Sequence, residues 1–296
     1  MPTKKIDLLQ LTEMFHSEDI CHDTLARLRW PNGAECPRCK CTKHGYDSKT
    51  YRYDCYGCGY GFTALAGTIF QDTKLPLRKW FMAVLLMVEA KKGISANQVK
   101  RTLGVSYKTA WYLCHRIRAA MAEANTLSGT IEVDETYIGG KVRGKGHGYK
   151  GNKTIVAGAM QRGGDVVLQV VDGNDRQTLH DFIHNSTDPR VRRIITDEWP
   201  AYRGISDEDT SHETVNHRAE EWVRGDVHTN TVEGVWSLFK RSITGSYHKL
   251  SAKHLDAYLD ELEWRFNNRK NPYLFRDTLT RLLGSDNLPY ERLVAQ

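Results

Sequence analysis

The sequence predicts a multidomain α+β protein in which a zinc ribbon and a helix-turn-helix precede a mixed-sheet α/β domain. Three observations predict this class. Two pairs of closely spaced cysteines lie near the N-terminus, two short capped helices follow them, and from residue 131 strand-like apolar runs come before and between helical patterns. Because 296 residues exceed one average domain, several units are expected.

The expected boundaries follow changes in pattern along the chain. Residues 7–30 contain one or two helix-like stretches, and a helix of mixed character is expected over 77–92, ending at Gly93. The predicted parts are an N-terminal helical segment (1–32), the zinc ribbon (33–68), the helix-turn-helix region (75–125), the α/β domain (130–270) and a C-terminal tail (271–296).

Four of the seven cysteines form two C-x₂-C pairs, CPRC and CYGC, with 15 residues between the pairs. This spacing is typical of a structural zinc site, since turn-forming residues beside each pair let the thiolates converge on one ion. Disulfides are not expected, because the cysteine total is odd and no secretion signal is evident. We therefore predict one structural Zn²⁺ bound by Cys36, Cys39, Cys55 and Cys58, with Cys41 as a rival ligand that breaks the paired spacing.

A helix-turn-helix is predicted over residues 95–121. Ser95 and Gln98 have the spacing of a capping box and open a short helix. Gly104 makes the turn, and Ser106 caps a second helix that would enter the major groove of DNA. The alternative is a helical hairpin that only packs against its neighbours. The predicted contacts to phosphates or bases are Lys100, Arg101, Tyr107, Lys108, Arg116 and Arg118.

The charge of the chain is unevenly distributed. Residues 1–130 carry 19 Lys or Arg and 11 Asp or Glu, whereas residues 131–296 carry 23 and 25. A basic half can bind a polyanion, since cations near phosphates release condensed counterions. We expect this half to bind DNA, although a solvated basic surface with no partner would have the same composition.

No segment is expected to cross a membrane. The longest apolar stretch, Trp80 to Val88, is too short to span a bilayer. The N-terminus lacks the small-residue cleavage site of a signal peptide. We therefore expect a cytoplasmic protein.

From residue 131 the pattern predicts a mixed sheet with flanking helices. The expected strands are 131–138, 154–160, 166–171 and 191–196, and the second and third form a hairpin across the QRGGD turn. The expected helices are 178–184, 230–243 and 251–267.

Three acidic residues lie where a cage of carboxylate oxygens can form. Asp134 lies within an apolar run, Asp197 ends another, and Glu233 lies in a helix-like stretch. Such a cage suits Mg²⁺ or Mn²⁺. Two of these ions, held about 3.5–4 Å apart, can clamp the attacking and leaving oxygens of a phosphodiester displacement. The chain is therefore predicted to cut or join nucleic acid, with Lys240, two helical turns after Glu233, beside a phosphate.

Each acid also has a simpler interpretation. Asp134 could be a solvated carboxylate on an edge strand, with Glu135 as a substitute ligand. Asp197 could cap the helix that follows it. Glu233 could complete an ordinary capping box with Asn230 at the start of its helix.

A glycine-rich basic segment, residues 139–153, follows the strand of Asp134 directly. Its cations could follow a DNA backbone near the acids, and a solvated loop is the alternative. The predicted DNA contacts in this segment are Lys141, Arg143 and Lys145.

Together these motifs resemble those of bacterial insertion-sequence transposases with a zinc ribbon and a DDE domain, a group related to Merlin transposons. The resemblance covers about residues 20–270. It rests on CPRC and CYGC, the helix-turn-helix, IEVDETYIGGK, IITDEW, HTNTVEGVWSLFKR and YLDELEWRFNNR in this order. It implies an RNase H-like catalytic fold with Asp134 on the first strand, Asp197 after the fourth, and the third ligand on a late helix. Some relatives have asparagine at the third position, which makes Asn230 the alternative to Glu233.

The resemblance also implies an activity. It implies a DNA transposase that binds terminal inverted repeats, cleaves at the ends and joins the 3′-hydroxyl ends to target DNA by two-metal transesterification. It further implies a synapsed homodimer or larger assembly, working at the nucleoid in the cytoplasm of a bacterium. The alternatives are an RNase H-like nuclease or resolvase without strand transfer, and a domesticated zinc-ribbon DNA-binding protein. The intact acids Asp134, Asp197 and Glu233 argue against the last.

Overall fold

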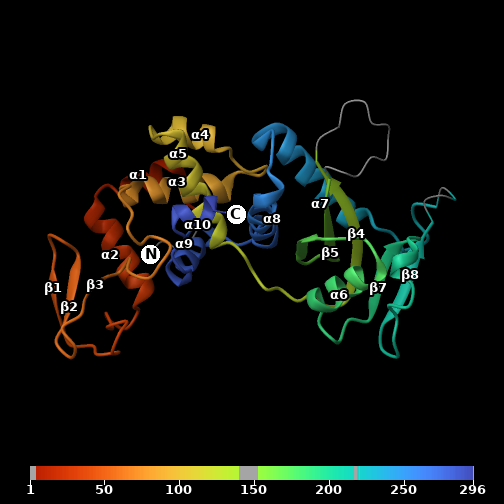
Figure 1. Cartoon of the computed structure of the whole chain (residues 1–296), viewed down its shortest axis with the longest axis horizontal. Coiled ribbons are helices and arrows are strands. Elements are labelled where there is room, and N and C mark those ends of the chain that lie inside the picture. Colours follow the sequence, from red (N-terminus) through yellow and green to blue (C-terminus); the bar gives the residue numbers. More distant parts are fainter. Residues whose placement is uncertain (1–4, 140–152, 217–218, 220, 296) are drawn as a thin grey trace. The chain divides into compact units, whose positions relative to one another are not determined.

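The computed structural model describes residues 5–139, 153–216, 219 and 221–295, and the chain divides into two compact units (Figure 1). The first unit comprises Met1–Met121 together with Lys270–Gln296, and the second comprises Ala122–Arg269. The two ends of the chain therefore build one unit, and the middle of the chain builds the other.

The first unit begins with two capped helices, α1 (Leu8–Met14) and α2 (Glu18–Arg29). Asp7 and Gln10 form a reciprocal capping box at α1, and the Ser17 hydroxyl accepts a backbone N–H at the start of α2. These side chains satisfy donors that the first helical turn leaves unpaired, which is why the helices begin at these residues. Both helices lie within residues 7–30, where one or two helical stretches were expected.

The zinc-ribbon region forms a small antiparallel sheet of β1 (His44–Asp47), β2 (Arg52–Cys55) and β3 (Gly61–Thr63). Aromatic side chains supply most of its small core. The Tyr53 and Phe62 rings stack across β2 and β3 with centroids 5.4 Å apart, and Trp30 packs its edge against both.

Three helices follow, α3 (Leu77–Glu89), α4 (Ala96–Leu103) and α5 (Tyr107–Ala119). The Ser95 and Ser106 hydroxyls cap α4 and α5, and Gly104 joins them with a left-handed φ of 61°. The helix-turn-helix layout is therefore confirmed. None of the described helices, including the apolar α3, is long and apolar enough to cross a membrane.

The segment predicted as a C-terminal tail is instead helical, with α9 (Leu274–Gly284) and α10 (Tyr290–Val294). The tail prediction is wrong because α9 has an apolar face that the first unit covers. Leu279 and Leu282 are fully buried, and the Phe275 ring lies 6.0 Å from that of Phe81 in α3. The C-terminal residues thus complete the core of the N-terminal unit.

The second unit contains a five-stranded mixed sheet in the order β6-β5-β4-β7-β8. The first three strands in this order are antiparallel, and β4, β7 and β8 run parallel. The strands are β4 (Thr130–Ile138), β5 (Thr154–Gln161), β6 (Val166–Val171), β7 (Arg193–Asp197) and β8 (Ser211–Val215). The four predicted strands and their hairpin are confirmed. Strand β8 was not predicted, because its sequence, SHETV, contains only one aliphatic residue and so lacks a strand-like apolar pattern.

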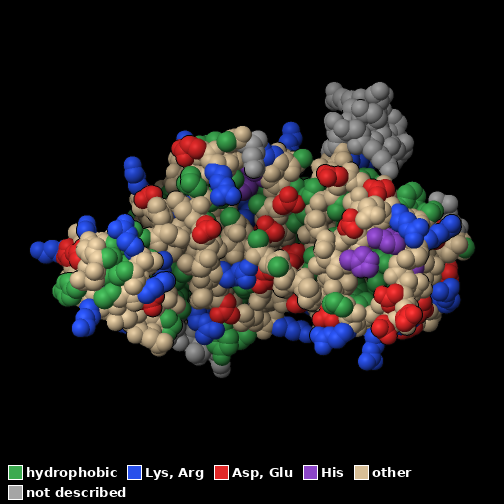
Figure 2. Space-filling model, turned by 60° about the horizontal axis from the view of Figure 1, so that its bottom comes forward, with side chains coloured by type: hydrophobic (Ala, Val, Ile, Leu, Met, Phe, Trp, Pro, Cys, Tyr) green, Lys and Arg blue, Asp and Glu red, His purple; other side chains and the backbone are tan. Residues whose placement is uncertain are grey.

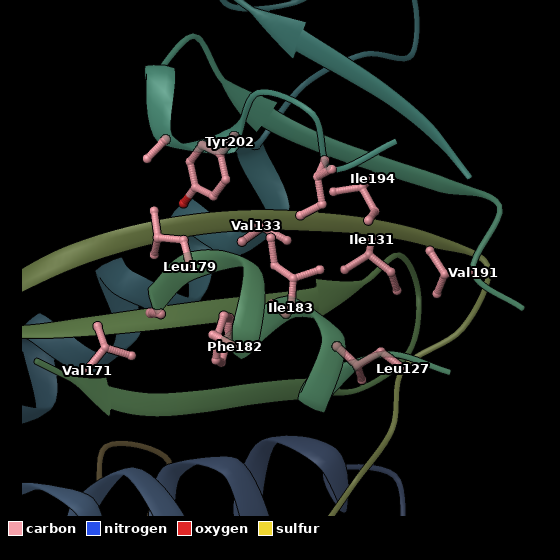
Figure 3. Packing of buried hydrophobic residues seen from close by; sticks show 14 residues of the cluster. Leu127, Ile131, Val133, Val171, Leu179, Phe182, Ile183, Val191, Ile194 and Tyr202 are labelled. Atoms are coloured by element: carbon pink, nitrogen blue, oxygen red, sulfur yellow. The ribbon is translucent and has the colours of Figure 1, made fainter. Parts of the chain in front are cut away.

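The faces of this sheet carry different helices. One face packs against α6 (Arg176–Ser186) and the short 3-10 helix η1 (Pro200–Tyr202). Figure 3 shows Leu179 and Phe182 of α6 lying over this face, to which Val133 of β4 belongs. The other face is covered by α7 (Asn230–Ser242) and α8 (Leu255–Asn267). Because side chains alternate along β4, its even-numbered residues point toward α7.

The free edge of β6 is closed by side chains of α8. Asn267 accepts from the backbone N–H of Val166 at 2.8 Å and donates to its carbonyl at 2.9 Å. Glu263 accepts from the backbone N–H of Leu168 at 3.0 Å. These bonds replace those of a neighbouring strand, so this edge is not available for strand pairing.

Candidate active site and metal centres

The four predicted cysteine ligands converge. Their sulfur atoms all lie within 4.8 Å of one another, with Cys36 and Cys58 at 3.7 Å and Cys39 and Cys55 at 3.5 Å. A tetrahedron of sulfurs about 2.3 Å from a central zinc has edges of about 3.8 Å. The cluster therefore fits one structural zinc ion. Cys41 is not part of it, and its thiol lies 3.6 Å from the Lys43 carbonyl.

Two of the predicted acids occupy matching positions on neighbouring parallel strands. Glu132 of β4 pairs with Ile195 of β7, so Asp134 and Asp197, two residues further on, face the same side of the sheet. Asp197 is the last residue of β7, at the carboxyl end where ligand sites gather in α/β sheets. Asp134 is the middle residue of β4 and lies two residues beyond the last β4–β7 pair. Strand β4 is the central strand of five, so the alternative of an edge strand with solvated carboxylates is wrong.

The carboxylates of Asp134, Glu135 and Asp197 repel one another. Burial, and after it the nearby carboxylates of Glu135 and Asp197, raises the pKa of Asp134 to about 7. Burial also raises the pKa of Glu135, although Tyr202 donates a hydrogen bond of 2.6 Å to its carboxylate. Ionised carboxylates held together in a buried place are stabilised by a bound cation, so these residues fit a divalent metal ion.

Asp197 does not act as the cap of the short helix that follows it. Its carboxylate accepts the backbone N–H of Trp199 at 3.0 Å, but the residue at the cap position of η1 is Trp199 itself. The carboxylate therefore shapes the turn after β7, and the helix-cap interpretation is not needed to explain it.

The start of α7 is capped by an acid that the sequence did not indicate. Glu132 is fully buried and accepts the backbone N–H groups of Thr231 at 2.8 Å and Val232 at 3.1 Å. It also pairs with Arg162 at 2.7 Å. The only sequence signal for this role was an acid two residues before Asp134 in an otherwise apolar strand.

The alternative in which Glu233 forms a capping box with Asn230 is wrong. The N-cap position of α7 is Thr229, and Asn230 is its first helical residue. Glu233 accepts a hydrogen bond of 3.0 Å from the Thr229 hydroxyl and forms no capping box with Asn230. Because Glu132 satisfies the first turn of α7, the exposed carboxylate of Glu233 is not required there.

A cavity of about 620 Å³ brings three of the four predicted active-site residues together. Asp134 and Glu233 lie on its wall, and Lys240 follows on the same helix. Asp197 is not part of the wall and lies beside it on β7. The cavity also contains residues that the sequence did not single out. Its complete lining is Asp134, Glu135, Thr136, Glu233, Trp236, Ser237, Lys240, Arg241 and Thr244.

The three acids do not close around a single point. Within the described part of the chain, the cysteines form the only group of three or more such ligands whose atoms lie within 4.8 Å of one another. Ligands shared between two ions can lie further apart, since each oxygen is about 2.1 Å from its own ion and the ions are about 3.5–4 Å apart. A site for two ions therefore does not require Asp134, Asp197 and Glu233 to meet at one point.

The predicted DNA contacts of the helix-turn-helix divide into two groups. Lys100, Arg101, Tyr107 and Lys108 are exposed on α4 and α5. Lys108 is also held in place, because its ammonium lies 4.2 Å from the centroid of the Tyr290 ring of α10. Figure 2 shows Lys and Arg side chains spread over the visible face of the first unit.

The other group corrects the sequence prediction. Arg116 and Arg118 are only 4% and 1% exposed, so neither offers its guanidinium to DNA at the surface. Arg116 donates to the backbone carbonyls of Ile69 and Gln71 and lies over the Trp80 ring. The six consecutive residues 113–118 of α5 are all buried, which the helical pattern alone does not reveal. The predicted contacts Lys141, Arg143 and Lys145 lie outside the described residues.

Comparison with known proteins adds three findings. Residues 126–267 match the ISXO2-like transposase domain, and residues 16–61 match the transposase zinc-ribbon domain. An uncharacterized protein in transposable element ISH50 of Halobacterium salinarum is 30% identical over 274 residues, in an alignment that covers 85% of this chain and 91% of that protein. Among solved structures, one similar chain is that of the Mos1 transposase paired-end complex with left transposon end. The two chains are 11% identical, and the match covers 73% of this chain and 83% of that chain. The TM-score is 0.27.

Proposed function

This chain belongs to the IS1595 family of DDE transposases, and we propose that it recognises the terminal inverted repeats of its own element, cuts there and joins the ends to target DNA. Family membership makes DNA the substrate and a divalent metal ion the cofactor. The proposal adds the recognised sequence class, the strand transfer and the residues that carry them.

One observation carries the proposal. Asp134 and Asp197 have matching positions on the parallel strands β4 and β7, and α7 lies on the same face with Glu233 and Lys240. Carboxylates from two strands and one helix, next to a lysine, have the chemistry that phosphodiester displacement requires.

The residues would have the following roles. Asp134, Asp197 and Glu233 would hold two divalent ions of the Mg²⁺ or Mn²⁺ type. When bound, these ions activate the attacking oxygen and stabilise the leaving oxygen. Lys240 would bind a phosphate of the DNA end through its ammonium group. Water would attack in cleavage and the freed 3′-hydroxyl would attack in joining, so no Ser or Tyr nucleophile is assigned.

The first unit would hold the DNA. Lys100, Arg101, Tyr107 and Lys108 are proposed as contacts to phosphates and bases, because they are exposed on the helix-turn-helix. A synapsed homodimer or larger assembly is proposed, since two ends must meet before joining. The cytoplasmic, nucleoid-associated location remains a prediction.

The test uses purified protein, Mg²⁺ and duplexes that carry the two ends of the element encoding this chain. We expect nicks that free 3′-hydroxyl groups and products in which these groups are joined to a second duplex, both lost in Asp197→Asn. Cleavage without joining would favour the nuclease or resolvase alternative. Binding without either reaction would favour the domesticated DNA-binding protein.

A further inference from the structure

A hydrogen bond links the candidate metal site to α7. The indole Nε1 of Trp236 donates to Oδ2 of Asp134 at 2.9 Å. We propose that Trp236 is a positioning residue that fixes the Asp134 carboxylate for a divalent cation, and that Gly158 exists to let the indole reach it. This inference rests on the proposed function and identifies how one of its ligands is oriented.

The indole group suits this role. Trp236 is 4% exposed, so its N–H is shielded from competing water. An indole N–H only donates and carries no charge, so it orients a carboxylate without pairing with the cation or neutralising the ligand. The indole bond is made to Oδ2 alone, so Oδ1 and the second lone pair of Oδ2 lie outside the indole contact. Such partners of metal ligands set the orientation and affinity of the site.

Gly158 is the second observation. It pairs with Asp134 across β4 and β5, on the face that α7 covers. A Cβ atom at this position would lie 2.5 Å from Cζ2 and 2.6 Å from Cη2 of Trp236. The φ angle of Gly158 is not positive, so the backbone does not require glycine there. Glycine weakens the interior of a strand and marks a close approach, which here is that of the Trp236 ring.

Glu132 provides a second attachment of α7 to β4. It binds the helix at Thr231 and Val232, and Asp134 binds it at Trp236. Two residues of strand span about 6.6 Å and four residues of helix span about 6 Å. The two attachments therefore match in spacing, and they hold Glu233 at a fixed place along the cavity.

The competing explanation is that Trp236 only fills the core with Val156 and Leu168. A packing role alters stability and leaves the cation affinity of the folded protein unchanged. The measurement that separates the two is therefore metal affinity in the absence of DNA. Mn²⁺ binding to the full-length, zinc-loaded protein can be followed by electron paramagnetic resonance, and the indole N–H of Trp236 by ¹⁵N NMR.

Two variants attack the bond in different ways. Trp236→Phe keeps an aromatic ring and removes the donor. Gly158→Ala keeps the donor and displaces the ring. We expect both to weaken Mn²⁺ binding about 10- to 100-fold while unfolding stays cooperative. In the wild type, Mg²⁺ should shift the indole resonance that Trp236→Phe removes, and Asp134→Asn should abolish this shift.

Matched controls isolate the effect. Gly234→Ala adds the same methyl group on α7, where nothing lies within 4 Å, and Trp222→Phe makes the same change at a side chain that is 58% exposed. Both should bind Mn²⁺ as the wild type does. If Trp236→Phe does not fold, the Mn²⁺ affinity of Gly158→Ala distinguishes a positioning role from a packing role.

Wild-type Mn²⁺ affinity in a folded Gly158→Ala protein, or in a folded Trp236→Phe protein, would overturn the proposal. That result leaves the proposed function standing as long as Asp134→Asn abolishes Mn²⁺ binding. If Asp134→Asn binds Mn²⁺ normally, the metal site itself is misassigned and both proposals fail.

Discussion

The two candidate metal centres of this chain differ in how they are assembled. The four thiols of the zinc ribbon come from two short turns and already lie within 4.8 Å of one another. The acids of the second unit come from β4, β7 and α7, and burial and mutual repulsion raise the pKa of Asp134 to about 7. A closed site of the first kind stabilises a fold, whereas an open and electrostatically unfavourable site of the second kind is suited to binding ions and substrate together.

The largest expected effect is the loss of activity on replacing an acid of the second unit. Asp134→Asn should lower cleavage and joining by about 10³-fold or more, which corresponds to about 4 kcal/mol of transition-state stabilisation. End binding should remain, because the first unit supplies it. Gel assays of nicked and joined DNA, with filter binding of the same duplex, measure both quantities. Wild-type cleavage in this variant would show that the acids of β4 and β7 do not form the active site.

The next largest effect is expected on zinc content when one of the four cysteines is replaced. Cys36→Ser should abolish zinc retention and unfold the ribbon, because metal binding supplies folding free energy to such sites. The sheet of the second unit should stay folded, since it lies in a separate compact unit. Zinc content and limited proteolysis measure these outcomes. Cys41→Ser is the matched control and should retain one zinc per chain, whereas full zinc content in Cys36→Ser would contradict the ligand assignment.

These two centres also show what the sequence could predict. The cysteine cluster is built from two C-x₂-C pairs with only 15 residues between them. The caps at Ser95 and Ser106 act on residues three positions further on, so local spacing was sufficient to predict both features. The cap that Glu132 provides for α7 joins residues about 100 positions apart, and no local pattern encodes it. The same reason explains the burial of Arg116, whose partners precede it by more than 40 residues.

The third prediction tests which residue of α7 is the third metal ligand, Glu233 or Asn230. Glu233→Gln should lower the cleavage rate by about 100-fold, because a neutral amide holds a divalent ion poorly. It should leave thermal stability nearly unchanged, since Glu132 caps the helix. Asn230→Ala is the control. If that variant loses activity and Glu233→Gln does not, the third ligand is Asn230.

The fourth prediction contrasts an exposed and a buried cation of the first unit. Lys108→Ala should weaken DNA binding several-fold and reduce its salt dependence by about one ion, with stability unchanged. Arg116→Ala should instead destabilise the unit by about 2 kcal/mol, because it leaves the carbonyls of Ile69 and Gln71 without their donor. Salt-dependent affinity and thermal unfolding separate these effects. Equal losses of affinity at unchanged stability would mean that both side chains contact DNA.

The smallest effect concerns a buried acid that has no role in the cavity. Burial, and more weakly the charge of Asp260, raises the pKa of Glu263 to about 8 against the opposing hydrogen bond from Leu168. Since the folded state then binds a proton more tightly than the unfolded state, stability should fall as pH rises from about 5 to about 8. Glu263→Gln keeps an acceptor for the Leu168 N–H and removes the buried charge. It should therefore be more stable than the wild type by about 1–2 kcal/mol at pH 8, and the difference should shrink toward pH 5. Cleavage should be unaffected, because Glu263 does not line the cavity. This separates Glu263 from Asp134, whose unfavourable charge is proposed to serve a bound ion. An equal stability difference at pH 5 and pH 8 would show that Glu263 is not the group whose proton uptake shapes this range.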